Sequence, residues 1–421
     1  MHLTLLAAGS RGDIQPFVAL GVALKMAGYT VRLTASENFK AFVEGYGLEV
    51  HSLAGDVTGV ASNPAIRDAL QADNPLKVIR SFNVLKRYAF EMQKDLYAAC
   101  EGAAAVIYHP GVSVGYVAAQ AAGIPSILAT PFPMTPTKDY PALVFYRSRF
   151  GKSANRLSHK LFEQIMWRTS KGPVKQFWQQ TFGGLPEAFT NPFPKQQTAA
   201  QPTLVACSEH VFPHPADWPE HVYTTGYWFL EPKRDWKPPR TLQAFLEQGP
   251  PPVYAGFGSV SDPTTAAKTT ACVLEALERS GQRGILASGW QGMTRPESLP
   301  EHVYMLESAP HSWLFPQTAA VIHHGGAGTT AAGFRAGVPS IIVPHSVDQF
   351  AWGARAYELG VGVKPIPKKK LDAERLARAI SEALAPEVKS AAAFLGQKIR
   401  AENGLAVATE LIARALAESG M

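Results

Sequence analysis

Short apolar runs alternate with amphipathic, helix-compatible stretches along almost the whole chain. In the first half, helix-compatible segments such as 16–27 and 86–101 separate the runs, and the runs that predict buried strands are residues 3–8, 30–35, 48–53, 104–108, 124–129 and 203–207. Buried strands that alternate with helices are typical of parallel sheets covered on both faces. The order therefore predicts a doubly wound α/β domain.

The same pattern restarts after a proline-rich break. Trp236 is followed by Lys-Pro-Pro-Arg, and a short helix then leads to Gly249-Pro250-Pro251-Pro252, a composition typical of an interdomain linker. Beyond this break, strands are expected at 253–258, 284–288, 303–306, 319–323 and 340–343. The helices expected between and after them cover about 264–280, 328–336, 348–359 and 371–384.

These two series predict an α/β protein with two Rossmann-like domains and doubly wound parallel sheets. The expected ranges are 1–235 for the N-terminal domain, 236–252 for the linker, 253–386 for the C-terminal domain and 387–421 for a helical tail. We expect the two domains to face each other across a cleft. The ligand should then lie outside the carboxyl ends of the strands.

Composition narrows the class of protein. Of the 421 residues, 46% are hydrophobic and 18% charged, which excludes a disordered chain. The three cysteines are far apart and form neither a disulfide framework nor a metal-binding CxxC pair, so we expect a reducing, cytoplasmic compartment. The first residues predict a β-strand and not a signal peptide, and no apolar run is long enough for a transmembrane helix.

The most informative segment is the glycine-rich stretch from His323 to Thr330, HHGGAGTT, which follows a predicted strand and opens a predicted helix. Glycines let the backbone approach a ligand closely, and the first N–H groups of a helix attract an anion. Together with the imidazole of His324 and the hydroxyl of Thr329, they suit a pyrophosphate. The alternative is a tight strand–helix turn whose glycines serve packing alone.

Two other nucleotide-binding classes are disfavoured. The first strand–helix turn, Gly9-Ser10-Arg11-Gly12-Asp13, lacks the GxGxxG pattern of dinucleotide-binding domains. No glycine-rich segment ends in the GK[ST] of a P-loop. A dehydrogenase and a P-loop NTPase are therefore poor interpretations.

A carboxylate and an amide, Asp348 and Gln349, begin the helix after the strand at 340–343. This pair offers the acceptor and the donor that vicinal sugar hydroxyls require. Taken alone, Asp348 is equally a residue that favours a helix N-terminus. Its position, one strand–helix unit after the glycine-rich turn, favours sugar binding.

Several motifs in the same order resemble a known family. The chain carries GSRGDIQPFVALGVAL near its start, then TPFPMTPTKDYP, TGYWFL, GFGSV, PHSWLFP, HHGGAGTTAAGFRAGVP and DQF. These segments resemble UDP-glucose:sterol 3-β-glucosyltransferases and close bacterial relatives, which are inverting glycosyltransferases of the GT-B fold. The resemblance runs from about residue 1 to residue 385.

The resemblance implies a donor site in the second half of the chain. His324 would contact the diphosphate, the amides from Gly326 through Ala327 and Gly328 to Thr329 would surround it, and Ser259 would lie near the phosphates. The backbone around Pro310 and His311 would hold the uracil, with Trp290 as a neighbour of the base, and Asp348 and Gln349 would bind the hexose. Plant secondary-metabolite relatives carry Trp, Gln and Glu where this chain has Ser308, His311 and Ala332. The choice among UDP-, dTDP- and GDP-sugars therefore stays open.

The resemblance also points to a base in the first turn. Many related enzymes use a histidine near this position, whereas the GSRGD subgroup offers Asp13. A carboxylate is a weak base for an alcohol, so proton removal would be concerted with departure of the sugar. The alternative is that Asp13 only caps the following helix. His109, in Tyr-His-Pro-Gly after another strand, is the second candidate for the catalytic or acceptor site.

Basic residues concentrate between residues 146 and 175. Eight of them stand against Glu163 alone: Arg147, Arg149, Lys152, Arg156, Lys160, Arg168, Lys171 and Lys175. Apolar residues recur between them at helical spacing: Leu157, Leu161, Phe162, Ile165 and Met166. Such a segment suits an anionic membrane surface, or equally a solvated helix whose apolar stripe packs on the domain. No nucleic-acid recognition motif accompanies it.

We therefore expect an inverting hexosyltransferase that moves glucose from UDP-glucose to a sterol-like hydroxyl, with no cofactor and no metal. It would be cytoplasmic and peripheral at the inner face of a membrane. One alternative is the same fold acting on a polyketide, carotenoid or glycolipid acceptor. Two others are a sugar-nucleotide epimerase, which would turn over UDP-sugar without an acceptor, and a binding protein without activity.

Overall fold

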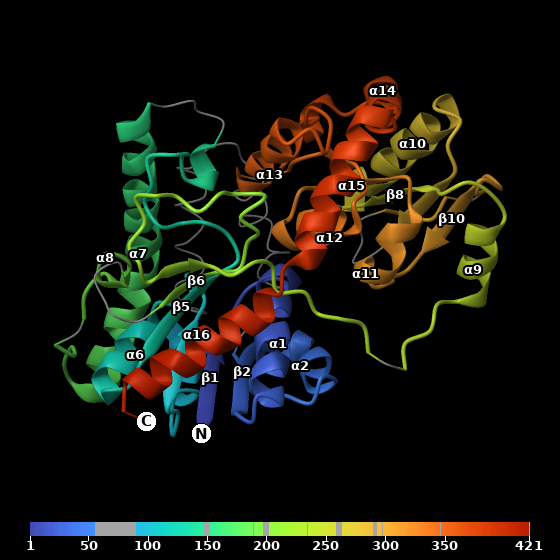
Figure 1. Cartoon of the computed structure of the whole chain (residues 1–421). Helices are drawn as coiled ribbons and strands as arrows, with labels where there is room; N and C mark the ends of the chain where they lie inside the picture. Colours follow the sequence, from blue (N-terminus) through green and yellow to red (C-terminus); the bar gives the residue numbers. More distant parts are fainter. Residues whose placement is uncertain are drawn as a thin grey trace. The chain divides into compact units, whose positions relative to one another are not determined.

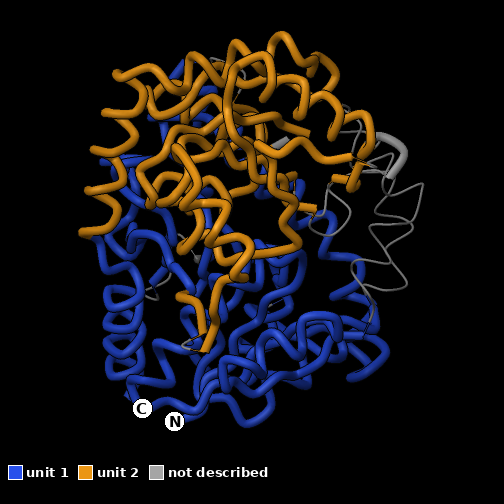
Figure 2. The backbone as a smooth tube through the Cα atoms, turned by 90° about the vertical axis from the view of Figure 1, so that its right-hand side faces the viewer, with its two compact units in different colours: residues 1–143, 148–230, 402–421 blue, residues 144–147, 231–401 orange. Residues whose placement is uncertain are grey.

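A computed structural model gives the architecture of the chain. The residues it describes are 1–54, 90–146, 151–187, 189–196, 202–233, 235–257, 263–288, 293–296, 298–345 and 347–420. They form two compact units (Figure 2). Unit 1 comprises Met1–Leu143, Ser148–Leu230 and Glu402–Met421, and unit 2 comprises Val144–Arg147 and Glu231–Ala401.

Unit 1 is built on a seven-stranded parallel sheet in the order β3-β2-β1-β4-β5-β6-β7. Its strands are β1 (His2–Leu6), β2 (Thr30–Ser36), β3 (Glu49–Leu53), β4 (Ala105–Tyr108), β5 (Ser126–Thr130), β6 (Thr203–Val205) and β7 (Val222–Thr224). Most residues of β1 and all residues of β4 and β5 are buried. Central strands covered on both faces have this continuous apolar character.

Helices cover both faces of this sheet (Figure 1). They are α1 (Arg11–Met26), α2 (Glu37–Glu44), α6 (Val114–Ala122), α7 (Lys152–Phe182), α8 (Pro192–Gln196) and α16 (Gly404–Glu418), and the short 3-10 helix η1 (Leu143–Phe145) precedes α7. α16 packs on α1, and its Ala408, Ile412 and Leu416 join the core formed by β1, β2 and α1. The last helix of the chain therefore completes the N-terminal unit.

Unit 2 contains a five-stranded parallel sheet in the order β10-β9-β8-β11-β12. Its strands are β8 (Val253–Gly256), β9 (Gly284–Ala287), β10 (Val303–Leu306), β11 (Ala320–His323) and β12 (Ser340–Ile342). Its helices are α9 (Arg240–Glu247), α10 (Pro263–Arg279), α11 (His311–Leu314), α12 (Ala327–Ala336), α13 (Val347–Glu358), α14 (Ala373–Ala383) and α15 (Pro386–Ala401), with short 3-10 helices η3 (Phe315–Gln317) and η4 (Lys368–Lys370). Within the unit, α10 packs on α14 and α12 packs on α15.

The prediction of two Rossmann-like sheets is confirmed, and every strand expected from the sequence is present. Two elements differ from the expectation. α1 begins at Arg11, five residues before the expected start, because the capping box of Ser10 and Asp13 starts the helix there and leaves Pro16 inside it. β7 is an additional strand, since its three residues are too short for a clear apolar run. Of the two helices of the expected helical tail, α15 lies in unit 2 and α16 in unit 1.

Each sheet reverses its strand order at one point. In unit 1 the order reverses between β1 and β4, and in unit 2 between β8 and β11. Ligands of open α/β sheets bind outside the carboxyl ends of the strands at such switch points. The segments that follow these four strands are therefore where a site is expected. In the described part of the chain, no helix has the length and apolar character needed to cross a bilayer.

Candidate active site at two sheet edges

The helix that follows β11 presents an uncapped amino end. Gly326 is the N-cap residue of α12, and no side chain among the described residues caps it. The first N–H groups of a helix have no intrahelical acceptor, so those of Ala327, Gly328 and Thr329 are available to a ligand. Gly328 is exposed, and its neighbours are half-buried. The combination of amide groups and helix dipole suits an anion.

Two glycines of this segment have different roles. Gly325 has φ +92°, and a Cβ there would lie 2.8 Å from Cγ2 of Ile342 and 3.0 Å from the carbonyl oxygen of Gln349. It is therefore required by the turn itself. A Cβ added at Gly328 would meet no atom within 4 Å, and this residue sits in a helix, where glycine is unfavourable. The fold gives no reason for a glycine at 328, whereas an anion at the helix end does.

His324 lies beside the amino end of α12. A Cβ added at Gly326 would approach its Nε2 to 2.6 Å, so the ring packs against the turn. Its Nδ1 is buried and has no hydrogen-bond partner among the described residues. Burial lowers the pKa of His324 to about 4. The ring is therefore neutral near pH 7 and can offer one N–H to a ligand oxygen.

The neighbouring His323 has a structural role. It is fully buried, and its Nδ1 accepts a hydrogen bond from the backbone N–H of Gly325 at 3.1 Å. Burial and the neighbouring His324 hold the pKa of His323 well below its usual value. The first imidazole of the pair thus supports the glycine turn, and the second faces the helix end.

The first turn of α13 lies next to this helix end. Asp348 is half-buried there, and Gln349 is buried. The side-chain oxygen of Gln349 accepts a hydrogen bond from the backbone N–H of His345 at 2.7 Å. The oxygen of Gln349 therefore helps to start α13. Sugar binding by Asp348 and Gln349 stays a prediction.

His345 is a member of this site that the sequence analysis missed. Its ring stacks on Phe257, the residue after β8, with centroids 5.7 Å apart and an interplanar angle of 19°. The ring of His324 lies 6.4 Å away. His345 thus joins residues that follow β8, β11 and β12 at one edge. Its place three residues after a strand next to the switch point is the signal that could have revealed it.

The remaining donor-site candidates have different outcomes. His311 begins α11, stacks on Phe315 at 4.2 Å and meets Tyr254 of β8 edge-on at 5.9 Å. It therefore belongs to the same sheet edge. Ser259 and Trp290 lie outside the described residues.

Acid is expected to destabilise the fold through the buried histidines. His324 has a pKa of about 4 in the folded chain and an ordinary value of 6.5, so the unfolded chain binds more protons between these values. The free energy of unfolding therefore falls as the pH drops through this window, by at most about 1.4 kcal/mol per pH unit for each such histidine. In urea unfolding at about pH 7 and about pH 5, the H324Q variant should lose less stability on acidification than the wild-type chain. Equal losses would contradict the assigned cause.

In unit 1, Asp13 lies in the first turn of α1, directly after β1. Its Oδ2 accepts hydrogen bonds from the backbone N–H and the hydroxyl of Ser10, at 2.7 and 2.9 Å. This oxygen therefore caps the helix, as the alternative interpretation expected. Its Oδ1 lies 3.7 Å from Nε2 of His109, and 33% of the side chain is exposed. Capping thus engages Oδ2 of Asp13, whereas Oδ1 lies beside His109, the residue that follows β4.

His109 follows β4 and is buried. Its Nδ1 accepts a hydrogen bond from the backbone N–H of Gly111 at 3.1 Å, which assigns the proton of a neutral ring to Nε2, on the side of Asp13. Burial lowers the pKa of His109, and the Asp13 carboxylate opposes that shift. A neutral ring whose N–H faces Asp13 is suited to orient the carboxylate, and its only lone pair is already engaged. Asp13 is therefore the better candidate for a base.

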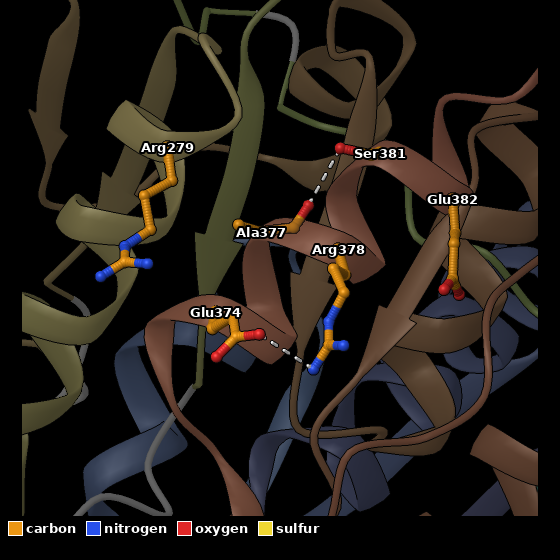
Figure 3. Close-up of a pocket in the computed structure, with 6 residues that line it drawn as sticks. All are labelled: Arg279, Glu374, Ala377, Arg378, Ser381 and Glu382. Carbon is orange, nitrogen blue, oxygen red and sulfur yellow. Dashed lines mark hydrogen bonds and ion pairs between the residues drawn. The ribbon is translucent and has the colours of Figure 1, made fainter.

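A hollow between α10 and α14 is lined by Arg279 and by residues of α14 (Figure 3). Arg279 ends α10 and therefore lies toward the amino edge of the sheet, opposite the candidate site. Its ion pairs are local: Arg279 pairs with Glu275 at 2.5 Å and Arg378 with Glu374 at 3.6 Å, each one helical turn apart. Apart from Glu382, the described lining residues therefore offer no unpaired charge of the kind that converges in a binding site. In the described ranges, no three His, Cys, Asp or Glu side chains gather as a metal site would require.

Comparison with known proteins agrees with this geometry. The family model for the glycosyltransferase family 28 N-terminal domain matches residues 3–141, and that for the erythromycin biosynthesis protein CIII-like C-terminal domain matches residues 274–417. Sterol 3-beta-glucosyltransferase UGT80B1 of Arabidopsis thaliana is 35% identical over 99% of this chain and 68% of its own length. The chain belongs to the sterol 3-beta-glucosyltransferase family. The family resemblance read from the sequence is thereby confirmed.

Other sterol 3-beta-glucosyltransferases match over nearly the whole chain. The protein of Yarrowia lipolytica is 36% identical over 99% of this chain, and UGT80A2 of Arabidopsis thaliana is 34% identical over 97%. The chain spans 29% of the Yarrowia protein and 65% of UGT80A2.

Solved structures support the fold. The glycotransferase of kitacinnamycin has a TM-score of 0.70 at 20% identity and covers 99% of both chains. The calicheamicin glycosyltransferase CalG4 has a TM-score of 0.68 at 17% identity, over 99% of this chain and 98% of its own. The expected GT-B fold class, with two Rossmann-like domains, is confirmed.

Proposed function

We propose that this chain is an inverting glucosyltransferase that moves glucose from UDP-glucose to the hydroxyl of a sterol or sterol-like acceptor. Similarity to sterol 3-beta-glucosyltransferases along 99% of the chain carries this proposal. The two sheet edges supply the chemistry that such a transfer needs. One offers an anion site for the donor, and the other offers a carboxylate for the acceptor.

In unit 2, the donor diphosphate would lie against the amino end of α12. The N–H groups of Ala327, Gly328 and Thr329 would each donate to phosphate oxygens, and the neutral His324 would donate through one ring N–H. Charge-assisted hydrogen bonds of this kind contribute about 1.5–3 kcal/mol each. The same groups stabilise the negative charge that grows on the diphosphate as it leaves, a task that a metal performs in other enzymes. We therefore propose metal-independent chemistry, with Asp348 and Gln349 at the hexose.

In unit 1, Asp13 would act as the general base. The acceptor hydroxyl oxygen attacks C1 of glucose while its proton passes to Oδ1 of Asp13, and the bond from C1 to the diphosphate breaks. UDP leaves with the electron pair of that bond, and attack from the opposite side inverts C1. His109 would orient the carboxylate through the Nε2–H that lies 3.7 Å from Oδ1, and Ser10 holds the other oxygen. Both neighbours of Asp13 thus serve to position it.

A sugar-nucleotide panel tests the proposal. The full chain is incubated with UDP-, dTDP- and GDP-glucose, each against sterols, polyketide aglycones, carotenoids and glycolipids, and products are identified by a mass increase of one hexose. We expect product with UDP-glucose and sterols. Turnover of UDP-glucose without any acceptor product would favour an epimerase, and product with another acceptor class alone would replace the sterol.

The basic segment supports a second part of the proposal, namely reversible docking on an anionic membrane. Arg147 and Arg149 lie outside the described residues, but the other six basic residues lie on α7 and are all exposed. Leu157 and Leu161 are 65% and 50% exposed among them, whereas Glu163 is buried. The exposed face of α7 is therefore cationic with two apolar side chains, a composition that suits anionic lipid. Phe162, Ile165 and Met166 are only half-buried, and Phe162 and Met166 pack inward.

Neutralising part of this face should weaken membrane binding. Each basic residue near an anionic bilayer contributes about 1 kcal/mol, so the triple variant R156Q/K160Q/K171Q should partition about 10²-fold more weakly into phosphatidylserine vesicles. Vesicle sedimentation at low and high salt measures this. A matched triple variant on unit 2, K268Q/R378Q/K389Q, has the same net charge and should bind as the wild-type chain does. Equal weakening by both variants would mean that vesicle binding depends on the net charge of the protein and not on the exposed face of α7.

A further inference from the structure

The loop that follows β5 is buried although it has no regular secondary structure. Residues 133–137 and 142 are buried, and the loop continues along the carboxyl edge of the unit 1 sheet. β5 neighbours β4, which ends next to His109, and β4 neighbours β1, which leads to Asp13. Buried backbone N–H and carbonyl groups require hydrogen-bond partners, so other segments must supply them to this loop. We refer to residues 131–142 as the β5 loop.

A polar face of α7 supplies those partners. Nδ2 of Asn155 donates to the carbonyl oxygen of Lys138 at 3.0 Å, and the hydroxyl of Ser158 accepts from the backbone N–H of Ala142 at 2.9 Å. Both side chains are buried, and they lie one helical turn apart. Two further contacts come from His159, which lies four residues after Asn155 on the same face of α7.

His159 contacts the β5 loop with both ring nitrogens. Its Nδ1 lies 3.1 Å from the carbonyl oxygen of Met134 and its Nε2 lies 3.0 Å from that of Tyr140. The ring is fully buried, and burial lowers its pKa, an effect that the two carbonyl groups oppose. One side chain thus joins two points of the loop that are six residues apart in sequence. Which nitrogen donates depends on the tautomer.

A second element holds the loop independently. Asp217 accepts a hydrogen bond from the hydroxyl of Thr137 at 2.6 Å and another from the backbone N–H of Lys138 at 3.0 Å. Nε1 of Trp218 donates to the carbonyl oxygen of Thr135 at 3.0 Å. These residues belong to the segment between β6 and β7. Side chains of α7 and of the segment between β6 and β7 therefore both hold the β5 loop. We refer to these side-chain contacts as the clamp.

The fastened loop carries apolar side chains. Met134 is buried and Phe132 half-buried in a small apolar cluster, which adjoins the core around β4 and α6 through Phe189. The other members of the cluster come from α7 and the segment around α8: Phe162, Met166, Trp167, Phe189 and Phe193. Phe132, Phe162, Met166 and Phe189 are only half-buried, and such aromatic and methionine side chains offer a surface for a rigid apolar ligand with a hydroxyl group.

We propose that Asn155, Ser158 and His159 are positioning residues for the acceptor: they hold the β5 loop, and through the half-buried Phe132 one wall of the acceptor site. This inference rests on the proposed function for the identity of the acceptor as a sterol. Loss of the clamp should therefore weaken binding of the acceptor. Donor binding at α12 should not depend on it.

The test uses two variants on different segments, each of which removes a contact with the β5 loop. H159F removes both contacts of the ring with carbonyl oxygens at similar volume, and D217N replaces one of the two acceptor oxygens of Asp217 by an amide group. Each should raise the KM for sterol about tenfold or more, with the KM for UDP-glucose changed less than about twofold. Q164A, on an exposed position of the same helix, should change neither. If H159F fails to fold, D217N carries the test from the other side.

Equilibrium binding of a fluorescent sterol to the full chain, without UDP-glucose, tests the clamp separately from the proposed glucosyltransferase function. Weaker sterol binding by H159F and D217N supports the clamp even if the wild-type chain transfers no sugar, in which case the proposed function alone fails. Sterol binding and sterol KM that stay within about twofold in both variants would overturn the clamp. An equal rise of the KM for donor and acceptor would do so as well, because it would indicate a general loss of structure.

Discussion

Replacing Asp13 by asparagine is expected to lower the rate of glucose transfer by about 10²–10⁴-fold, the usual contribution of a general base. Asparagine keeps an oxygen that can accept the hydrogen bonds from Ser10, so the cap of α1 should survive. The affinity for UDP-glucose should stay unchanged, because the groups proposed to bind its diphosphate lie at the amino end of α12. Steady-state kinetics and calorimetric titration of UDP measure the two effects.

The capping role of Asp13 can be separated from the catalytic one. D13A removes both roles, so it should lose about as much activity as D13N and also about 1 kcal/mol of stability. A matched control is D372N: Asp372 caps α14 by accepting from the backbone N–H of Arg375 at 2.8 Å, away from the candidate site. D372N should keep full activity. Near-normal turnover by D13N would remove Asp13 from the mechanism.

Replacing Gly328 by valine is expected to weaken UDP-glucose binding about 10²-fold without damaging the fold. The space around Cα of Gly328 is open, and valine is no worse than glycine in a helix. Its side chain would occupy the place of the diphosphate and displace it from two charge-assisted hydrogen bonds, together about 3 kcal/mol or more. Titration of UDP measures the affinity, and thermal unfolding measures the fold.

G184V provides the comparison for this variant. Gly184 also has nothing within 4 Å of a Cβ, but it lies after α7 in unit 1. G184V should bind UDP as the wild-type chain does. Unchanged affinity in G328V would mean that the amino end of α12 holds no diphosphate, and loss of thermal stability would mean that the glycine serves the fold.

The parts of this protein that the sequence predicted are those with a local signal. The βα alternation predicted both sheets, because continuous apolar strands such as β4 and β5 are buried on both faces. The glycine-rich turn predicted the uncapped helix after β11, since glycine, strand and helix follow one another within a few residues. The order of the motifs predicted the family.

What the sequence did not predict depends on contacts between distant segments. His345 and Phe257 are far apart in sequence and meet only because β8, β11 and β12 are neighbours in the sheet. Along α7, Asn155, Ser158 and His159 are polar and yet face inward, whereas Leu157 and Leu161 face solvent. A polar residue at helical spacing ordinarily indicates a solvated face. Here the buried loop reverses that rule, because its backbone N–H and carbonyl groups require partners.

The linkage of the sugar in the product tests the central claim most directly. Wild-type chain, UDP-glucose and a sterol are incubated with a metal chelator, and the anomeric configuration of the product is determined by NMR. Glucose is α-linked in UDP-glucose, so the proposed single displacement, with Asp13 as base and UDP departing at α12, predicts a β-glucoside that forms in the presence of the chelator. An α-glucoside, or release of free glucose with no sterol product, would contradict it.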